Sequence, residues 1–313
     1  MIKADLIHLS FNFWEDKVYD GDGKNAYLKQ RYFSPELRFD KKLFHEVTRK
    51  MSDSRMNMVV IDLGDGVKYK SHPEIAVDGA LSVAELKEEL SRLRDLGLEP
   101  IPKMNFSSCH DVWLGEYSKM LSTPKYYEVC SDLIMEAAEI FDGPRFFHIG
   151  MDEETYEHQK EYEYVVVRQG QLWWDDLCRL FEDVKKTGAR SWMWSDKIWH
   201  CGPEVFEKYV PKDVLQSNWY YYNKYELDPE QEPYFTYLKA FLQLDKMGYE
   251  QVPGASVWDN YENYPELVKF CKEHIQPEKL LGFMMTVWYS MVPEHSKIQF
   301  DAIEVVKNTH QEV

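Results

Sequence analysis

The sequence predicts an α/β protein folded as a single (β/α)8 TIM barrel. Eight short apolar segments with the character of buried strands alternate with helices or helix-sized segments along the chain. Strands that alternate with helices imply a parallel sheet, and eight such units in one chain of this length fit a closed barrel. No linker rich in Pro, Gly or Ser divides the chain, so we expect one domain over residues 1–313. The alternative is a doubly wound open sheet, but the Gly-rich phosphate turn after its first strand is missing.

In the first half of the chain, the clearest element is the helix that follows Ser82. Ser82 and Glu85 have the spacing of a capping box, the apolar residues between 83 and 96 share one helical face, and Gly97 ends the helix. The other helices expected here cover residues 41–51 and 126–141. The expected strands are residues 6–13, 57–63, 100–106 and 146–152.

The second half repeats the same alternation. The expected strands are residues 190–194, 214–220, 252–258 and 281–288. The expected helices are residues 169–187, 234–247, 265–274 and 294–307. Together with the first half this gives eight strands, each followed by a helix or a segment long enough for one, which is the repeat of the barrel.

Composition excludes several classes of function. Lys and Arg total 37 against 54 Asp and Glu, and this net charge of −17 argues against nucleic acid or an anionic membrane as a partner. The five cysteines are scattered without a CxxC pair, which indicates reduced thiols. No apolar run reaches the ~20 residues of a membrane helix. The first residues lack the pattern of a signal peptide, so we expect a cytoplasmic protein, or a periplasmic or secreted one if a signal was trimmed.

The stretch Arg145 to Thr155, which reads RFFHIGMDEET, is the most informative part of the sequence. Side chains alternate along a strand, so His148 and Asp152 share the face that looks into a barrel. The acids that end the stretch then lie at the C-terminal ends of the strands, where barrel enzymes place catalytic groups. Three consecutive acids also suit the first turn of a helix, but the buried strand and inward histidine before them favour a site.

Aromatic and polar residues recur at the ends of the other expected strands. Tryptophans end strands five to eight, interleaved with acids and amides, which favours a cradle for sugar rings over an aromatic-rich rim without function. The residues that we expect to bind substrate are His110, His148, Trp194, Asp196, Trp219, Tyr220, Trp258, Asp259 and Trp288.

The motif His148-Ile-Gly-Met-Asp-Glu153 resembles the HxGxDE signature of family 20 glycoside hydrolases, the β-N-acetylhexosaminidases. Upstream, the run from His72-Pro-Glu-Ile to His110 is similar to the family's turn, helix and strand end. Downstream, Trp194-Ser-Asp196 resembles the family's strand-five motif, and Trp219 and Trp288 lie where its later tryptophans would be. The resemblance covers roughly residues 55 to 290, although only the strand-four motif is specific.

The resemblance implies substrate-assisted cleavage of a terminal N-acetylated amino sugar with retention of configuration. In these enzymes the 2-acetamido oxygen of the substrate attacks the anomeric carbon, in place of a second protein carboxylate. Glu153 would be the general acid and base, and Asp152 would orient the acetamide. We also expect the neighbouring carboxylate of Asp152 to help Glu153 hold its proton.

The sequence also departs from the family pattern. The family places an arginine near the end of strand one, where this chain reads His8-Leu-Ser-Phe-Asn12-Phe-Trp14, and Lys103 and Asn105 replace common acids on strand three. Two alternatives therefore remain: a barrel that binds glycans without cleaving them, and a glycosidase with two protein carboxylates. The latter would pair Glu153 with Asp62, Asp196 or Asp259.

A cofactor is not expected. His8, His110, His148 and Asp152 are the residues that could bind a metal, but strand one lacks the His-x-His pair typical of metal-dependent barrel hydrolases. We therefore predict no metal and no cofactor. The expected partner is a carbohydrate, an amino-sugar glycoside, and the sequence does not define the oligomeric state.

Overall fold

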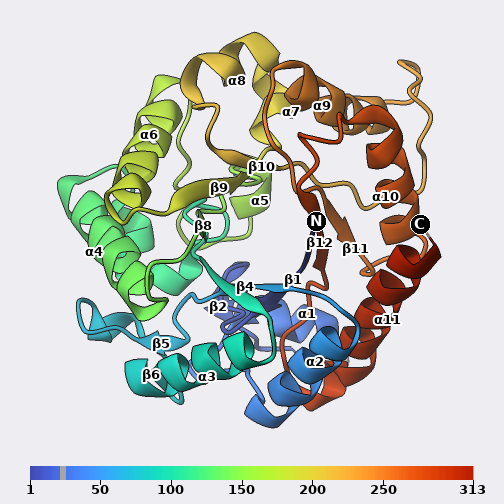
Figure 1. Cartoon of the computed structure of the whole chain (residues 1–313). Helices are drawn as coiled ribbons and strands as arrows, with labels where there is room; N and C mark the ends of the chain where they lie inside the picture. The colour runs from blue at the N-terminus through green and yellow to red at the C-terminus, as the bar shows by residue number, and fades with distance from the viewer. Residues whose placement is uncertain (22–25, 313) are drawn as a thin grey trace.

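The computed structural model describes residues 1–21 and 26–312, and at its centre is a barrel of eight parallel strands (Figure 1). The strands are β1 (Ile2–His8), β4 (Met58–Asp62), β7 (Glu99–Lys103), β8 (Phe146–His148), β9 (Arg190–Trp194), β10 (Leu215–Ser217), β11 (Gly254–Ser256) and β12 (Gly282–Thr286). They pair in the order β10-β9-β8-β7-β4-β1-β12-β11. Parallel bridges from Gln216 to Gln251 and from Trp219 to Gly254 join the two ends of this order. The predicted (β/α)8 barrel is confirmed.

Helices surround the barrel (Figure 1). The outer helices are α2 (Lys41–Asp53), α3 (Val83–Asp95), α4 (Pro124–Ile140), α6 (Gln171–Lys186), α8 (Pro203–Tyr209), α9 (Tyr234–Lys246), α10 (Asn263–His274) and α11 (Ser296–Glu312). All but α8 match predicted helices within a few residues. The capping box of α3 is formed, because the Ser82 hydroxyl accepts from the Glu85 N–H and the Glu85 carboxylate accepts from the Ser82 N–H.

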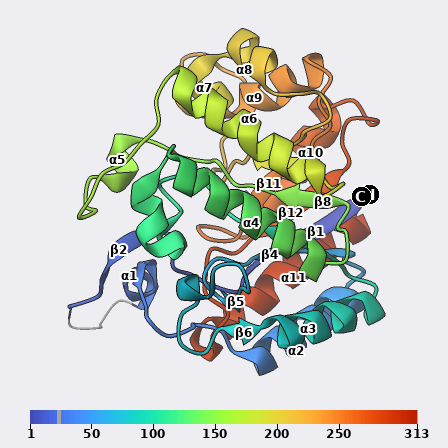
Figure 2. The same ribbon diagram turned by 90° about the vertical axis from the view of Figure 1, so that its left-hand side faces the viewer.

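Short elements fill the loops between strands and outer helices. They are β2 (Glu15–Val18), α1 (Ala26–Arg31), β3 (Tyr32–Phe33), β5 (Val67–Lys68), η1 (Pro73–Ile75), β6 (Leu81–Ser82), η2 (Val112–Met120), α5 (Tyr156–Gln159), α7 (Lys197–Cys201) and η3 (Pro293–His295). In Figure 2, β2, α1 and α5 lie at the end of the barrel opposite to the chain termini. This is the end at which the strands finish, so these loop elements cover the predicted site.

The apolar residues form two cores, as alternation along the strands requires. One lies inside the barrel and includes Leu6, Val60, Ile101, Trp192 and Met284. The larger one lies between the strands and the helices. Full burial of an aliphatic or aromatic side chain stabilises a fold by about 1.5–3 kcal/mol, so this double packing holds the strand ends in fixed positions.

The first strand begins and ends earlier than predicted. It covers Ile2–His8, and Ile2 already pairs with Gly282 of β12. Lys3 and Asp5 interrupt the apolar pattern at its start, which moved the prediction toward the later aromatic residues. As a result, the residues from 9 to 14 belong to the loop above the barrel.

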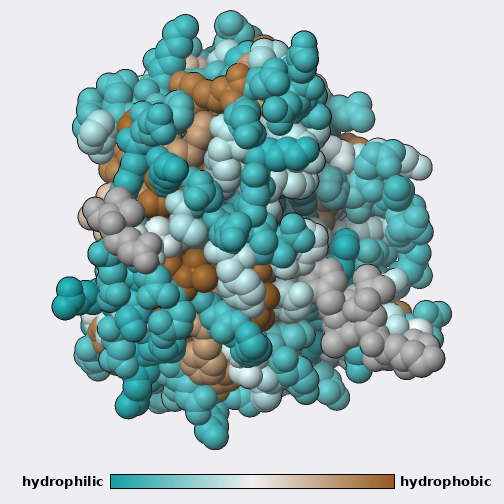
Figure 3. All heavy atoms as spheres, turned by 90° about the vertical axis from the view of Figure 1, so that its right-hand side faces the viewer, coloured by the Kyte–Doolittle hydropathy of each residue, from teal (hydrophilic) through white to brown (hydrophobic). Residues whose placement is uncertain are grey.

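The outer surface is mostly hydrophilic. On the face that carries α10 and α11, hydrophobic side chains show only as small separate patches (Figure 3). None of the helices described in residues 1–21 and 26–312 is long and apolar enough to cross a membrane.

Candidate active site

A pocket of about 310 Å³ opens at the C-terminal ends of the strands. Its walls come from the loops after β1, β8, β9, β10, β11 and β12, together with α1 and α5. The lining residues are Trp14, Arg31, Asp152, Glu153, His158, Trp194, Trp219, Tyr221, Tyr222, Trp258 and Trp288. The pocket therefore brings together the two predicted catalytic acids and four of the predicted tryptophans.

The backbone that carries the two acids has an unusual conformation. Strand β8 ends at His148, and φ is positive at Gly150 (69°), Met151 (76°) and Glu153 (55°). At Gly150 a side chain has no room, because a Cβ there would lie 2.7 Å from the Cα of Asn105. These left-handed residues break the strand alternation, which the sequence analysis had continued to Asp152. The break explains how two consecutive side chains both reach one pocket.

Asn105, from the end of the third barrel strand, fixes this segment. Its amide nitrogen donates to Asp152 Oδ1 at 2.7 Å, and its amide oxygen accepts from the Met151 N–H at 3.0 Å. Asp152 is 6% exposed and Asn105 is 3% exposed. The Asp152 carboxylate is thus held in one orientation at the edge of the pocket.

Two histidines flank the carboxylate of Glu153. Nε2 of His110 lies 3.2 Å from Glu153 Oε2 and 3.4 Å from Asp152 Oδ2, and Nε2 of His158 lies 3.6 Å from Glu153 Oε1. His110 is buried behind the acids, whereas the His158 side chain is 41% exposed. Each oxygen of the Glu153 carboxylate therefore faces one imidazole.

The histidines reverse the expected protonation of Glu153. Burial raises the pKa of Glu153, but the contacts with His110 and His158 outweigh burial and hold this pKa well below its usual value. Burial lowers the pKa of His110, and the charges of Asp152 and Glu153 raise it above its usual value. The expectation that Asp152 keeps Glu153 protonated is therefore wrong, because His110 contacts both carboxylates and, with His158, lowers the pKa of Glu153.

Asp196 lies behind the acids and outside the pocket lining. Its Oδ2 accepts from the Glu153 N–H at 2.9 Å, and its Oδ1 has no hydrogen-bond partner among the described residues. Burial, followed by the charge of Asp152, raises the pKa of Asp196 to about 7. Asp196 thus positions the Glu153 backbone and holds a proton near neutral pH.

Aromatic rings form the walls of the pocket. The rings of Trp219 and Tyr221 are stacked with centroids 5.0 Å apart, and Trp288 lies 6.4 Å from Tyr221 and 6.2 Å from Trp194. Thr286 donates from its hydroxyl to the Tyr221 hydroxyl at 3.2 Å. These flat apolar faces with polar edges suit the faces and hydroxyl groups of a sugar ring.

Five lining residues are absent from the predicted set: Trp14, Arg31, His158, Tyr221 and Tyr222. Arg31 ends α1 far from any strand end, and its guanidinium lies 4.9 Å from the Trp14 ring centroid and 3.8 Å from Glu15. His158 lies in α5, five residues after Glu153. Tyr221 and Tyr222 directly follow the predicted Tyr220. A loop contribution such as Arg31 has no periodic signal in the sequence, whereas the closeness of His158 to the acids could have been noticed.

Five predicted substrate-binding residues do not line the pocket: His110, His148, Asp196, Tyr220 and Asp259. Tyr220 is buried and donates to the Lys224 carbonyl, so this prediction is corrected to its neighbour Tyr221. His148 is buried beneath the pocket, where its ring packs 4.9 Å from that of Trp194 and Nδ1 accepts from the Gly150 N–H. Asp259 is exposed and, like Asp196, does not line the pocket.

His110, Asp152 and Glu153 form the one group of potential metal ligands found in residues 1–21 and 26–312. Their ligand atoms lie within 4.8 Å of one another. The same atoms contact each other as ion pairs. His8 and His148, which the sequence analysis also considered as metal ligands, do not belong to this group.

Comparison with known proteins matches this architecture. No family model and no curated protein sequence matches the chain. Among solved structures, the β-N-acetylhexosaminidase of Bacteroides fragilis aligns over 96% of this chain and 65% of its own, with a TM-score of 0.62 and 13% identity. The chain has the fold of the β-N-acetylhexosaminidases.

Two further structures have the same hexosaminidase fold. The Streptomyces plicatus N-acetyl-β-hexosaminidase, solved with Thio-NAglucal, covers 97% of this chain and 62% of its own at a TM-score of 0.63 and 13% identity. Dispersin B covers 98% of this chain and 99% of its own at a TM-score of 0.57 and 13% identity. The alignment covers slightly less than two thirds of the Bacteroides fragilis and Streptomyces plicatus enzymes and nearly all of dispersin B.

Proposed function

We propose that this protein is a glycoside hydrolase of the β-N-acetylhexosaminidase type, which removes a terminal N-acetylated amino sugar with retention of configuration. The observation that carries the proposal is the convergence of Asp152 and Glu153 on one aromatic-walled pocket. A volume of about 310 Å³ is at the lower end of the range of small-molecule sites, which supports the binding of a single terminal sugar.

The proposed reaction has two steps. In the first, the acetamide oxygen of the substrate forms a bond to the anomeric carbon, the glycosidic C–O bond breaks, and Glu153 donates a proton to the leaving oxygen. In the second, Glu153 accepts a proton from water, the water oxygen bonds to the anomeric carbon, and the acetamide bond to that carbon breaks. Asp152, fixed by Asn105, accepts from the acetamide N–H and stabilises the positive charge of the intermediate.

The proton for the first step starts on a histidine. In the free protein the contacts with His110 and His158 lower the pKa of Glu153, and the charges of Asp152 and Glu153 raise the pKa of His110, so the geometry favours the proton on His110. A sugar that fills the pocket excludes water and brings its glycosidic oxygen toward Glu153. Removing water takes away the solvation that stabilises charged groups, which disfavours both the ionised form of Glu153 and the protonated form of His110. A proton passed from His110 to Glu153 turns this ion pair into two neutral groups. We infer that substrate binding drives this transfer.

Arg31 supports the recognition of sugar hydroxyl groups. Strand one supplies no arginine, but the Arg31 guanidinium reaches the pocket from α1 and lies over the Trp14 ring. A guanidinium has five N–H donors in a planar fork and suits vicinal hydroxyl groups. We propose that Arg31 donates to the hydroxyls of the terminal sugar.

The test compares three aryl glycosides: the N-acetylglucosaminide, the N-acetylgalactosaminide and the glucoside. We expect hydrolysis of one or both acetamido sugars and kcat/KM at least about 10³-fold lower for the glucoside, because the glucoside lacks the internal nucleophile. Product analysis by NMR should show the β-anomer first. Equal hydrolysis of the glucoside would remove the acetamide from the mechanism.

A binding protein without activity is the second candidate. The ion pairs that keep Glu153 ionised favour it, since an ionised carboxylate cannot donate a proton. Calorimetry that finds N-acetylglucosamine binding, together with no turnover of any of the three glycosides, would decide for this candidate. A two-carboxylate glycosidase is less supported, because Asp62 is buried against Lys103 and neither Asp196 nor Asp259 lines the pocket.

A further inference from the structure

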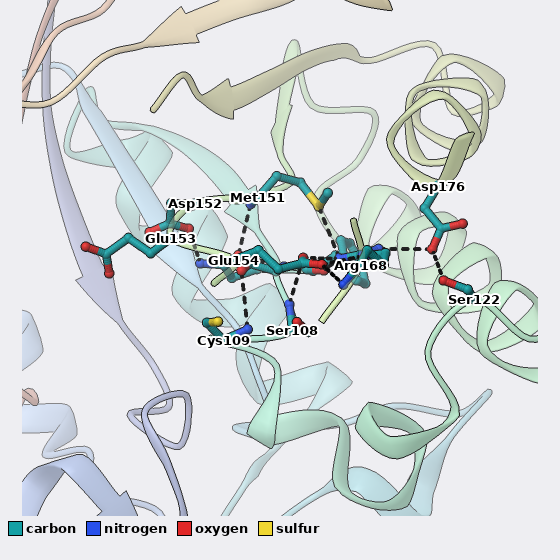
Figure 4. Close-up of polar contacts among 12 residues, drawn as sticks. Ser108, Cys109, Ser122, Met151, Asp152, Glu153, Glu154, Arg168 and Asp176 are labelled. Atoms are coloured by element: carbon teal, nitrogen blue, oxygen red, sulfur yellow. Dashed lines mark hydrogen bonds and ion pairs between the residues drawn. The ribbon is translucent and has the colours of Figure 1, made fainter. Parts of the chain in front are cut away.

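A buried ion pair lies directly beside the two acids but outside the pocket. Arg168, in the segment between α5 and α6, donates from Nε to Glu154 Oε1 at 2.9 Å and from Nη2 to Glu154 Oε2 at 2.6 Å. Both side chains are 1% exposed. Figure 4 shows Glu153 and Glu154 directed to opposite sides of the backbone, with only Glu154 turned toward Arg168.

This arrangement has a high energetic cost and a dense set of contacts. Taking a carboxylate and a guanidinium out of water costs several kcal/mol per ion, and the partners must compensate. Arg168 also donates from Nη2 to the Phe106 carbonyl at 2.6 Å and from Nη1 to Asp176 Oδ2 at 3.2 Å. Glu154 Oε1 accepts in addition from the Arg168 N–H at 2.8 Å.

The pair joins the segment that carries the acid to the segment that carries its histidine. Glu154 follows Glu153 in the chain, and its Oε2 accepts from the Ser108 N–H at 3.1 Å, two residues before His110. One position further along, the Thr155 N–H donates to the sulfur of Cys109 at 3.3 Å. We call this line of contacts between residues 105–110 and 151–155 the seam.

The distance between Glu153 and His110 depends on the seam. Neither ring nitrogen of His110 makes an aligned hydrogen bond within the described chain, so the ring is placed by its backbone and by packing, including Trp14 at 4.8 Å. Glu153 has a left-handed backbone with φ of 55°, a conformation that is unfavourable for a residue other than glycine and persists only where the surroundings enforce it. The seam provides this enforcement on both sides of the 3.2 Å contact.

We propose that Arg168 and Glu154 are positioning residues, and that their buried ion pair sets the distance between Glu153 and His110. This proposal rests on the proposed function, in which that contact holds the proton for catalysis. Neither side chain touches the substrate pocket, so their effect passes through the seam.

The chain offers a matched control. Arg145 and Glu99 form a second bidentate pair, with Nε to Oε1 at 3.0 Å and Nη2 to Oε2 at 2.6 Å. The seam joins the segments that follow β7 and β8, whereas this pair joins the starts of the same two strands, at the opposite end of the barrel. Glu99→Gln removes the same charge from a forked pair that is exposed to solvent and does not reach the seam.

The experiment measures the pKa of His110 by NMR of the full chain with labelled histidine, with His110→Gln used to assign the signal. Arg168→Lys is the main variant, because it keeps the net charge but cannot make the forked contact. We expect the His110 pKa to fall by about one unit in Arg168→Lys and Glu154→Gln, and to stay unchanged in Glu99→Gln. If these two variants do not fold, Asp176→Asn, which weakens only the outer contact of Arg168, should lower the pKa by a smaller amount.

Kinetics give the second readout. With the best acetamido substrate, Arg168→Lys should lower kcat about 10- to 100-fold with little change in KM, and should shift the pH profile. A fall in melting temperature with an unchanged His110 pKa and unchanged kinetics of the folded enzyme would overturn the proposal, since the pair would then be purely structural. If the wild type hydrolyses no glycoside, the proposed function fails, but the His110 titration still decides whether the pair sets the contact.

Discussion

Two clusters of charged residues occupy the barrel, and their difference explains where function resides. In the interior, Lys103 and His8 contact Asp62, and all three side chains are at most 6% exposed. At the strand-four end, His110 contacts Asp152 and Glu153, and the Glu153 side chain is 23% exposed and lines a pocket. Both clusters join a histidine to a carboxylate, but only the second can meet a ligand.

What covers each cluster makes the difference. The ring of His8 lies 4.9 Å from that of Phe13 and 5.1 Å from that of Phe11, and the indole of Trp288 lies 5.4 Å away. Burial raises the pKa of Asp62, but the charge of Lys103 and the His8 contact outweigh burial and lower this pKa to about 2. The interior cluster is therefore closed off from any ligand, and the proposed function assigns proton transfer to the strand-four cluster alone.

The largest effect is expected for Glu153→Gln. Loss of the general acid should lower kcat/KM for an acetamido substrate with a natural leaving group by about 10³-fold or more. An aryl glycoside with a very good leaving group should lose less in its first step, because that group needs no proton. Steady-state kinetics with both substrates check this, and full activity of the variant with the natural substrate would refute the role of Glu153.

Asp62→Asn tests the interior cluster. It leaves the Lys103 charge buried without its partner, so the free energy of unfolding should fall by about 3–5 kcal/mol. Activity per folded molecule should stay within a few-fold of the wild type, because Asp62 does not line the pocket. Urea unfolding and kinetics of the same preparation measure both quantities. A variant that is as stable as the wild type but inactive would place Asp62 in the active site instead.

Asp196→Asn should change how stability depends on pH. The pKa of Asp196 is raised from 3.8 to about 7 by burial and by Asp152, so the folded state binds this proton more tightly than the unfolded state. Its contribution to stability is complete below about pH 3.8 and is lost as the pH rises toward 7. The variant lacks this loss, so its free energy of unfolding should rise by about 2 kcal/mol relative to that of the wild type when the pH is raised from 5 to 8. If urea unfolding gives the same difference in free energy between the variant and the wild type at pH 5 and at pH 8, the raised pKa of Asp196 is contradicted.

Arg31→Gln is expected to have the smallest effect. Loss of the guanidinium should raise KM for the acetamido substrate about tenfold, which is close to one charge-assisted hydrogen bond, and should change kcat less. Arg31→Lys should recover only part of the affinity, because an ammonium lacks the planar fork. An unchanged KM in Arg31→Gln would mean that the sugar hydroxyls are bound elsewhere.

The barrel could be predicted from the sequence because its pattern is regular. Buried strands and amphipathic helices repeat, and the Ser82 capping box has a local signature that the structure reproduces. The strand-four acids could be singled out because they follow a buried strand, but β8 ends at His148 and a left-handed segment brings both side chains to the pocket. Strand β1 was misplaced because Lys3 and Asp5 hide its start.

Other parts of the site follow from tertiary structure. Arg31 enters from a loop helix. Tyr221, and not the predicted Tyr220, lines the pocket because the strand ends before both residues, at Ser217. The low pKa of Glu153 depends on His110, 43 residues away in the chain, and on its distance of 3.2 Å. No local pattern in the sequence predicts the distance between His110 and Glu153.

The most direct measurement is a calorimetric titration with the thiazoline derived from N-acetylglucosamine, which mimics the bicyclic intermediate. The wild-type protein should bind it much more tightly than N-acetylglucosamine, and Asp152→Asn should lose most of this difference, because the amide cannot stabilise the positive charge. Wild-type protein that binds the thiazoline no better than the free sugar, or a variant that binds it as tightly as the wild type, would contradict an active site built on Asp152 and Glu153.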